Sequence, residues 1–297
     1  MATETAVAVS HPLAGPLDLA AGRSPTQVVA SFNYYNDPGD GSLPEPVFVK
    51  SDTVTNKRSL VPTPVAVTDV TGQEDKFTLD GNGFQFCHHE SKCREGGYRN
   101  DGKVEAEYYP EMEQLLKDVT GGTRVFIFDH KTRCGPSNWH SLGPGNQAKR
   151  GPILRTHVDQ SYAGAESLLR WLLPGEADTL LKKRWQIINA WRPIKTIYKD
   201  PLAVADAKSI AEEDLVPAKI IYTDHERESW TIKPSAAHRW YFKYAQRPDE
   251  VLLIKCFDSR TDGVARRAPH SAFQDPRHVD DAWRESIEIR TMVFYDI

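Results

Sequence analysis

Short segments with several apolar positions each, separated by polar turn residues, fill the second half of the chain. They are KIIYTD, SWTIKP, HRWYFKY, EVLLIKCFDS, PHSAF and SIEIRTMVFYD. Each is rich in β-branched and aromatic residues and bounded by turn residues, so each predicts a strand. Helical spacing occurs earlier, from about Glu105 to the glycine pair 121–122 and after a capping Ser161. This order predicts a mainly β protein with flanking helices and a double-stranded β-helix core, a cupin-like jelly roll.

The chain of 297 residues is long enough for one large domain. We find no internal repeat and no convincing linker in it. Residues 1–25 are rich in Ala, Pro and Gly, and we expect them to form a disordered leader. We therefore expect residues 26–297 to form a single domain, with the jelly-roll core at roughly 150–297.

Composition restricts the partners. The formal net charge is -4, with acidic and basic residues interspersed, so no basic face for nucleic acid is expected. No apolar run is long enough to cross a bilayer, and no secretory signal is recognisable. The four cysteines are then expected to be reduced thiols of a cytoplasmic protein. The segment CHHESKC at 87–93 lacks the second ligand pair that a structural zinc site needs.

Three His-x-carboxylate motifs occur, and they begin at His88, His157 and His278. Only His157-Val158-Asp159 lies on an extended segment, where residues i and i+2 project from one face. With the later His270 it could place two imidazoles and one carboxylate around one iron(II), leaving open positions for a cosubstrate and oxygen. The alternative is a hydrogen-bonded surface pair at 157 and 159 and an ordinary histidine at 270.

The last strand carries an unusual polar face. Arg284, Ser286 and Arg290 would share one side, while Ile287 and Ile289 take the other. An arginine at this place can hold a carboxylate through a two-pronged, charge-assisted contact. The alternative is a solvated face on which Glu288 pairs with the arginines.

The order His-x-Asp, distal His, Arg-x-Ser resembles iron(II)/2-oxoglutarate-dependent oxygenases. More closely, the chain resembles a fungal hydroxylase/desaturase family of secondary metabolism that includes gibberellin desaturase-like and cephem-methoxylase-like proteins. The segments that carry this resemblance are NYYNDPGDG, RTHVDQS, NAWRPI, DPLAVAD, HRWYFKY, DEVLLIKCFDS, APHSAF and RESIEIR.

The resemblance implies a dioxygenase that uses Fe(II), 2-oxoglutarate and O2. It would hydroxylate, desaturate or cyclise a small molecule at a C–H bond, with release of succinate and CO2. The iron ligands would be His157, Asp159 and His270. Arg284 would bind the distal carboxylate of 2-oxoglutarate with help from Ser286. Arg290 would support the end nearer the metal or pair with Glu288, and the long spacing from His270 to Arg284 leaves open which of the two arginines holds the distal carboxylate.

Candidate substrate residues come from two strand segments: Asn189, Trp191, Arg192, Trp240 and Tyr241. For the aromatic members, core packing is the alternative. Arg133 and His140 flank or lie in a Gly/Pro-rich loop, and its length suggests a lid. Three other functions remain open: an iron oxidase of the same fold without 2-oxoglutarate, a non-catalytic metabolite-binding jelly roll, and a nucleic-acid demethylase suggested by the paired arginines.

Overall fold

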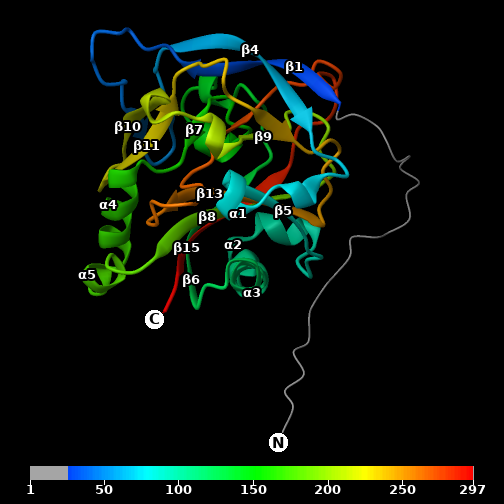
Figure 1. The fold of residues 1–297 in the computed structure, drawn as a ribbon. Coiled ribbons are helices and arrows are strands. Elements are labelled where there is room, and N and C mark those ends of the chain that lie inside the picture. Colours follow the sequence, from blue (N-terminus) through cyan, green and yellow to red (C-terminus); the bar gives the residue numbers. More distant parts are fainter. Residues whose placement is uncertain (1–25, 297) are drawn as a thin grey trace, which may run out of the picture.

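The computed structural model describes residues 26–296, which form two facing β-sheets (Figure 1). The large sheet contains, in spatial order, β1 (Gln27–Tyr35), β4 (Leu60–Asp69), β12 (Trp240–Phe242), β9 (Leu202–Ala205), β14 (His270–Ala272), β7 (His157–Val158), β11 (Glu226–Ile232), β10 (Leu215–Ile221), β2 (Val47–Val49) and β3 (Val54–Thr55). The small sheet contains β5 (Phe84–His88), β13 (Glu250–Asp258), β8 (Trp185–Pro193), β15 (Ser286–Phe294) and β6 (Arg124–Arg133).

This arrangement is the predicted jelly roll, but it includes much of the chain before residue 150. Strands β1 and β4 pair antiparallel along nine residue pairs in the large sheet. In the small sheet, β6 pairs with β15 from Arg133 opposite Ser286 to Arg124 opposite Phe294. The sheets therefore extend beyond the region 150–297 that was expected to hold the core. The expected leader at 1–25 lies outside the described residues.

The inner face of the small sheet changes from apolar to polar along its central strands. On β15, Met292 and Phe294 belong to the apolar core between the sheets, whereas Glu288 and Arg290 line a cavity. On β8, Trp185 and Ile187 belong to the same core. Because side chains alternate across a strand, these residues of each strand share one face. One end of the sandwich is thus packed with apolar side chains, and the other is polar.

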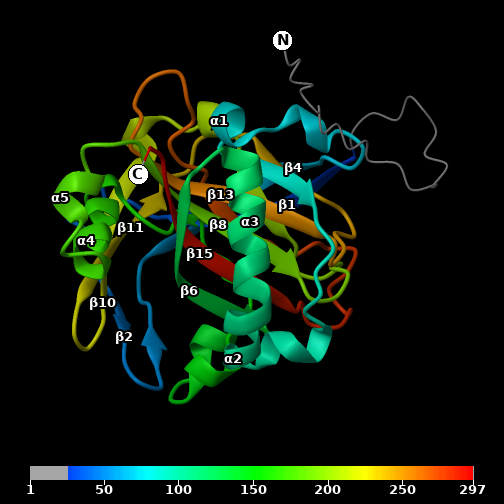
Figure 2. The ribbon, with the colours of Figure 1, turned by 90° about the horizontal axis from the view of Figure 1, so that it is seen from below.

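The helices cover what the sheets leave exposed. The described helices are α1 (Leu79–Asn82), α2 (Asp101–Lys103), α3 (Tyr109–Thr120), α4 (Tyr162–Leu172) and α5 (Ala177–Leu180). Helix α3 lies across the outer face of the small sheet (Figure 2), where Met112 and Leu116 pack against Ile287 and Ile289. A π-helical segment, Val104–Tyr108, precedes it. Both helices expected from the sequence are confirmed.

Helix α4 begins where the sequence predicts. The Ser161 hydroxyl accepts a hydrogen bond from the amide of Gly164 at 2.8 Å, which satisfies one of the free N–H groups of the first turn. The cap directly follows the His157–Asp159 segment, so the helix start helps to hold that segment in place. Within residues 26–296, no helix has the length and apolar character needed to span a membrane.

Candidate active site

Three side chains from distant parts of the chain meet on the inner face of the large sheet. His157 lies on β7 and His270 on β14, and the two residues are directly opposite each other in the antiparallel pairing of these strands. Asp159 follows β7, and its Oδ1 is 3.4 Å from Nε2 of His157. One potential ligand atom from each of the three residues lies within 4.8 Å of the others. Among the described residues this is the one such cluster of His, Cys, Asp or Glu.

Backbone carbonyls orient both imidazole rings. Nδ1 of His157 donates to the carbonyl of Arg155 at 2.8 Å, and Nδ1 of His270 donates to that of Ala268 at 3.2 Å. A carbonyl can only accept, so each Nδ1 carries the proton and each Nε2 keeps its lone pair for a metal. Burial, followed by the neighbouring His157, lowers the pKa of His270 to about 4. This keeps the ring of His270 neutral, the state in which it can be a ligand.

Asp159 reaches from the large sheet to the small one. Its Oδ2 accepts a hydrogen bond of 2.8 Å from the side-chain amide of Asn189 on β8, and it lies 3.8 Å from Nη1 of Arg290. Burial by itself would raise the pKa of Asp159, but His157, Arg290 and His270 together hold it well below its usual value. Asp159 is therefore an anion whose outer oxygen is held by the opposite sheet.

Asn189 also contacts a second buried carboxyl group. Its Nδ2 donates to Oε1 of Glu288 on β15 at 3.0 Å. Burial, and then the charge of Asp159, raises the pKa of Glu288. The amide thus connects the carboxylate of the cluster to a carboxyl group that favours its neutral form.

The two arginines of the last strand have different surroundings. Arg290 forms an ion pair with Asp129 on β6, and the charges of Asp129 and Asp159 outweigh burial and raise its pKa. Arg284 donates from Nη1 to the carbonyl of Asp200 at 2.8 Å, and its Nε is buried with no hydrogen-bond partner among the described residues. Burial, followed by the charge of Arg133, lowers the pKa of Arg284 to about 9. Arg284 thus retains a free hydrogen-bonding group.

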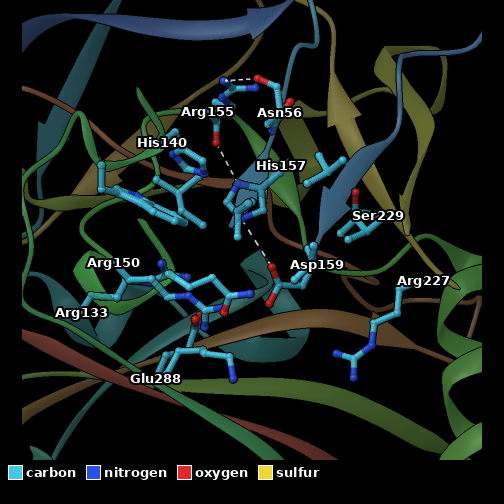
Figure 3. Close-up of a pocket in the computed structure, with 18 of the residues that line it drawn as sticks. Asn56, Arg133, His140, Arg150, Arg155, His157, Asp159, Arg227, Ser229 and Glu288 are labelled. Carbon is cyan, nitrogen blue, oxygen red and sulfur yellow. Dashed lines mark hydrogen bonds and ion pairs between the residues drawn. The ribbon is translucent and has the colours of Figure 1, made fainter. Parts of the chain in front are cut away.

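A cavity of about 570 Å³ opens beside the cluster. Figure 3 shows Arg155 above His157, Arg133 and Arg150 on one side of Asp159, and Arg227 on the other side. Seven arginines and two lysines line this cavity, against three carboxyl groups, at 129, 159 and 288. The strongly positive wall contrasts with the net negative charge of the whole chain.

The loop before β7 forms one wall of the cavity. The rings of His140 and Trp139 are tilted by 34° with centroids 3.7 Å apart, and the indole of Trp139 donates to the carbonyl of Pro152 at 3.0 Å. The side chain of Asn146 exchanges hydrogen bonds with both backbone groups of Val54 on β3. Arg133 and His140 both line the cavity, in agreement with their expected place, while movement of this loop as a lid stays a prediction.

Of the five residues predicted to contact substrate, Trp191 lines the cavity and Asn189 binds Asp159 and Glu288. Arg192, in contrast, does not line the cavity. It is the next residue on the strand, so it points to the opposite face, where it donates to the hydroxyl of Tyr108 and to Nδ1 of His89. Asn189 and Arg192 cannot both face the cavity because their positions differ by an odd number.

Trp240 and Tyr241 also lie away from the cavity, among aromatic side chains. Trp240 packs against Phe32 in the apolar core and donates from Nε1 to the hydroxyl of Tyr34 at 2.8 Å. Tyr241 packs against Phe77, with ring centroids 4.7 Å apart. Neither lines the cavity, so the core-packing alternative describes both residues.

Two functional candidates were missed at the sequence level. Arg155 shares the face of His157 and Asp159 through the same i, i+2 alternation, so the motif could have been extended by two residues. Asp129 is the partner of Arg290, and this contact depends on the register between β6 and β15. No pattern in the sequence sets that register.

The other histidine motifs have local partners. His88 pairs with Asp249, and His278 pairs with Asp281 at 2.8 Å. Cys87 and Cys93 are free thiols, and burial raises the pKa of Cys87 to about 12. Neither segment forms a cluster of potential metal ligands among residues 26–296.

Two histidines and one carboxylate on the inner face of a jelly roll, beside a cavity, define the class of non-haem iron oxygenases. Comparison with known proteins identifies the family. A family model described as "Oxidoreductase/YMDC permease-like domain" matches residues 32–294. The hydroxylase/desaturase efuI of Hormonema carpetanum is 36% identical, over 93% of this chain and 98% of that protein. The alpha-ketoglutarate-dependent dioxygenase phiK of a fungal species is 32% identical, over 90% of this chain and 96% of that protein.

Solved structures agree with these relatives. The iron and alpha-ketoglutarate-dependent endoperoxidase NvfI superposes with a TM-score of 0.75 at 26% sequence identity, covering 93% of this chain and 100% of that one. The chain belongs to the family of fungal iron(II)/2-oxoglutarate-dependent hydroxylases and desaturases. The family resemblance expected from the sequence is therefore confirmed.

Proposed function

We propose that this protein is an Fe(II)- and 2-oxoglutarate-dependent dioxygenase that oxidises a small molecule of fungal secondary metabolism, with residues 26–297 acting as one oxygenase domain. One observation carries the proposal: ligand atoms of His157, Asp159 and His270 converge within 4.8 Å of one another in the wall of a cavity. A binding module without catalysis has no need of such a set. The related dioxygenases and endoperoxidase named above add independent support.

The side chains present fit the metal and the cosubstrate. His157, Asp159 and His270 would hold the iron through two neutral imidazoles and one carboxylate, the donor set that this metal accepts on one face. Arg284 would bind the distal carboxylate of 2-oxoglutarate, because its buried Nε is free and its charge is not paired. Ser286, whose buried Oγ also lacks a partner among the described residues, would assist.

Arg290 would support the metal end of the site rather than the distal carboxylate. Its guanidinium already pairs with Asp129 and lies beside Asp159, so it is not free to neutralise a second anion. This division assigns the two arginines of the last strand to separate tasks.

When bound, iron would activate O2, the oxidant of the reaction, and 2-oxoglutarate would supply two of the electrons as it is converted to succinate and CO2. The chain's part is to orient the substrate's C–H bond and to exclude water. Trp191 and Trp139, which line the cavity and are themselves buried, provide apolar walls for both tasks.

The test is turnover of 2-oxoglutarate by the purified protein. Anaerobic addition of Fe(II) and then 2-oxoglutarate should produce a weak visible charge-transfer band. Admission of O2 should then release succinate even without substrate, at a slow uncoupled rate. Oxygen consumption that does not depend on 2-oxoglutarate would instead identify an oxidase of the same fold. No band and no succinate would favour a binding protein.

The compartment is part of this proposal. All four cysteines are free thiols, a state typical of a reducing compartment, and we infer a cytoplasmic enzyme. Labelling of the native protein in intact cells with a membrane-permeant thiol reagent, compared with an impermeant one, tests the inference.

A further inference from the structure

The cavity holds more positive charge than iron and 2-oxoglutarate can use. Of its seven arginines, Arg290 is the one with ion pairs among the described residues. The hydrogen bonds of the other six go to neutral acceptors, which are backbone carbonyls, an amide and an imidazole; these six are Arg58, Arg133, Arg150, Arg155, Arg227 and Arg284. One arginine is enough for the distal carboxylate of 2-oxoglutarate. The remaining arginines have enough unpaired positive charge to bind a second anion.

Arg155 is the best placed member of this surplus. It lies two residues before His157, on the same face, and its own carbonyl orients the ring of His157. Its Nη2 makes one long hydrogen bond of 3.3 Å to the carbonyl of Asn56, and its Nη1 is buried with no partner among the described residues. Arg155 is half-buried, and a buried N–H donor such as its Nη1 is costly unless an acceptor binds there.

A second arginine contacts the same residue as the first: Asn56 accepts from Arg155 through its carbonyl and from the backbone amide of Arg58 through Oδ1. Arg58 also lines the cavity, and its Nε and Nη2 donate to the carbonyls of Glu45 and Lys219. Burial, and then the charge of Arg155, lowers the pKa of Arg58 to about 10. Two like charges without a counter-charge repel each other, and an anion between or beside them relieves the repulsion.

This pair is separate from the proposed cosubstrate site. Arg155 precedes β7 of the large sheet, whereas Arg284 precedes β15 of the small sheet and contacts Asp200 and Trp191. The lining of this cavity also includes apolar side chains, among them Val54, Leu60 and Ile153, next to polar ones such as Asn56. That combination suits a hydrocarbon skeleton with one charged end.

We propose that the substrate is an organic acid, with an apolar skeleton and a carboxylate that binds Arg155 and the neighbouring Arg58. The proposal rests on the dioxygenase function and names its substrate class. The carboxylate anchors one end of the molecule, and the apolar wall directs the rest toward the metal cluster. Arg155 is then a substrate-binding residue that sets specificity, and it has no part in holding 2-oxoglutarate.

The experiment uses a matched pair of probes, 2-naphthoate and methyl 2-naphthoate. Both are titrated anaerobically into the protein loaded with Fe(II) and saturating 2-oxoglutarate, and the change in the visible band reports binding. We expect the acid to bind at least roughly tenfold more tightly than the ester, the effect of a charge-assisted hydrogen bond. The variant Arg155→Met should lose this preference and keep its affinity for 2-oxoglutarate.

Two further variants control the result. Arg170→Met removes an exposed arginine of α4 and should leave the preference unchanged. Arg155→Lys keeps the charge and should keep most of the preference, which guards against a folding defect in the methionine variant. The melting temperature of Arg155→Met should be equal to or above that of the wild type, because the change removes an uncompensated buried charge.

Several results would overturn the proposal. They are equal affinity of the wild type for acid and ester, an acid preference that survives in Arg155→Met, displacement of 2-oxoglutarate by the acid, and weaker 2-oxoglutarate binding in Arg155→Met. Succinate release without substrate is measured in parallel. If it occurs while acid and ester bind equally, the dioxygenase function stands and the assignment of an acidic substrate fails.

Discussion

The side-chain amide of Asn189 donates a hydrogen bond of 2.8 Å to Oδ2 of Asp159, and this bond connects the two sheets at the metal cluster. The other carboxylate oxygen, Oδ1, faces His157. Asn189 therefore fixes which oxygen of Asp159 is presented to a metal. It acts on the ligand from outside, as hydrogen-bonding partners of metal ligands commonly do.

Replacement of Asn189 by alanine should weaken iron binding roughly 10- to 100-fold, because Asp159 loses the bond that orients it. The measurement is the Fe(II) concentration that gives half-maximal succinate formation, with the KM for 2-oxoglutarate determined at saturating iron. Gln114→Ala, on the exposed side of α3, is the control and should change neither value. An unchanged iron requirement in Asn189→Ala would show that Arg290 alone suffices to orient the carboxylate.

Replacement of His270 by alanine should have a larger effect, since it removes one of three ligands. We expect iron binding to fall by more than the 100-fold upper range for an outer partner, and succinate formation to fall with it. Calorimetric titration with Fe(II) under anaerobic conditions measures the binding. The corresponding change at His278, whose ring pairs with Asp281 at the surface, should leave iron binding intact. Full iron binding by His270→Ala would refute the triad.

Arg284→Met should affect the binding of 2-oxoglutarate, whereas Arg290→Met should affect the stability of the fold. The first should raise the KM for 2-oxoglutarate roughly 10- to 100-fold, the loss expected for charge-assisted hydrogen bonds to a carboxylate. The second should lower the free energy of unfolding by on the order of 2 kcal/mol, because Asp129 and Asp159 lose a charged partner while Asp129 keeps only Lys131. Steady-state kinetics and denaturant unfolding of both variants separate the two roles. A raised KM in Arg290→Met together with a lowered stability in Arg284→Met would show that the two roles were assigned the wrong way round.

Arg192→Met tests the correction of the predicted substrate site. Arg192 bonds Tyr108 and His89 on the side of the small sheet that α3 covers, so its loss should lower the melting temperature. The KM for 2-oxoglutarate and the acid preference of the cavity should not change. If the variant kept its melting temperature but changed its preference for 2-naphthoate over the methyl ester, Arg192 would be a substrate-binding residue after all.

A buried ion cluster at the end of β13 should make stability depend on pH. Nζ of Lys255 lies 2.9 Å from Oδ2 of Asp258, and both side chains are fully buried. Burial by itself would raise the pKa of Asp258, but Arg184, Lys255 and Gln186 together lower it. A lowered carboxyl pKa stabilises the fold above the unfolded value of about 4, and that contribution is lost as the pH falls through the folded value.

Asp258→Asn should therefore lower the free energy of unfolding at pH 7 by on the order of 3 kcal/mol, since Lys255 keeps only Asp80 as an ionised partner. The difference from the wild type should begin to shrink below about pH 4, where the unfolded chain takes up a proton at this carboxyl group, and it should vanish as the pH falls through the lower folded pKa. Thermal unfolding of both proteins between about pH 3 and pH 7 measures the loss of stability and its dependence on pH, because this range includes the unfolded carboxyl pKa of about 4. Asp178→Asn, an exposed pair with Arg170, should show no such dependence.

The sequence by itself determined most strands of the second half, the two longer helices and the iron ligand candidates, but it did not indicate β5 or β9. Alternation on a strand is a local property, so the common face of His157 and Asp159, and that of Glu288 and Arg290, could be read directly. The resemblance to fungal oxygenases then named the chemistry. Local spacing also contained the position of Arg155 in the cavity wall, although the motif was not extended far enough to find it.

Only the tertiary structure decided which groups face each other. The pairing of His270 with His157, of Arg290 with Asp129 and of Asn189 with Asp159 depends on strand register and on the way two sheets stack. Trp240 and Arg192 show the same limit, because an aromatic or cationic residue on a strand can face the core, a helix or a cavity. Packing between distant segments chooses among these, and no local pattern encodes that choice.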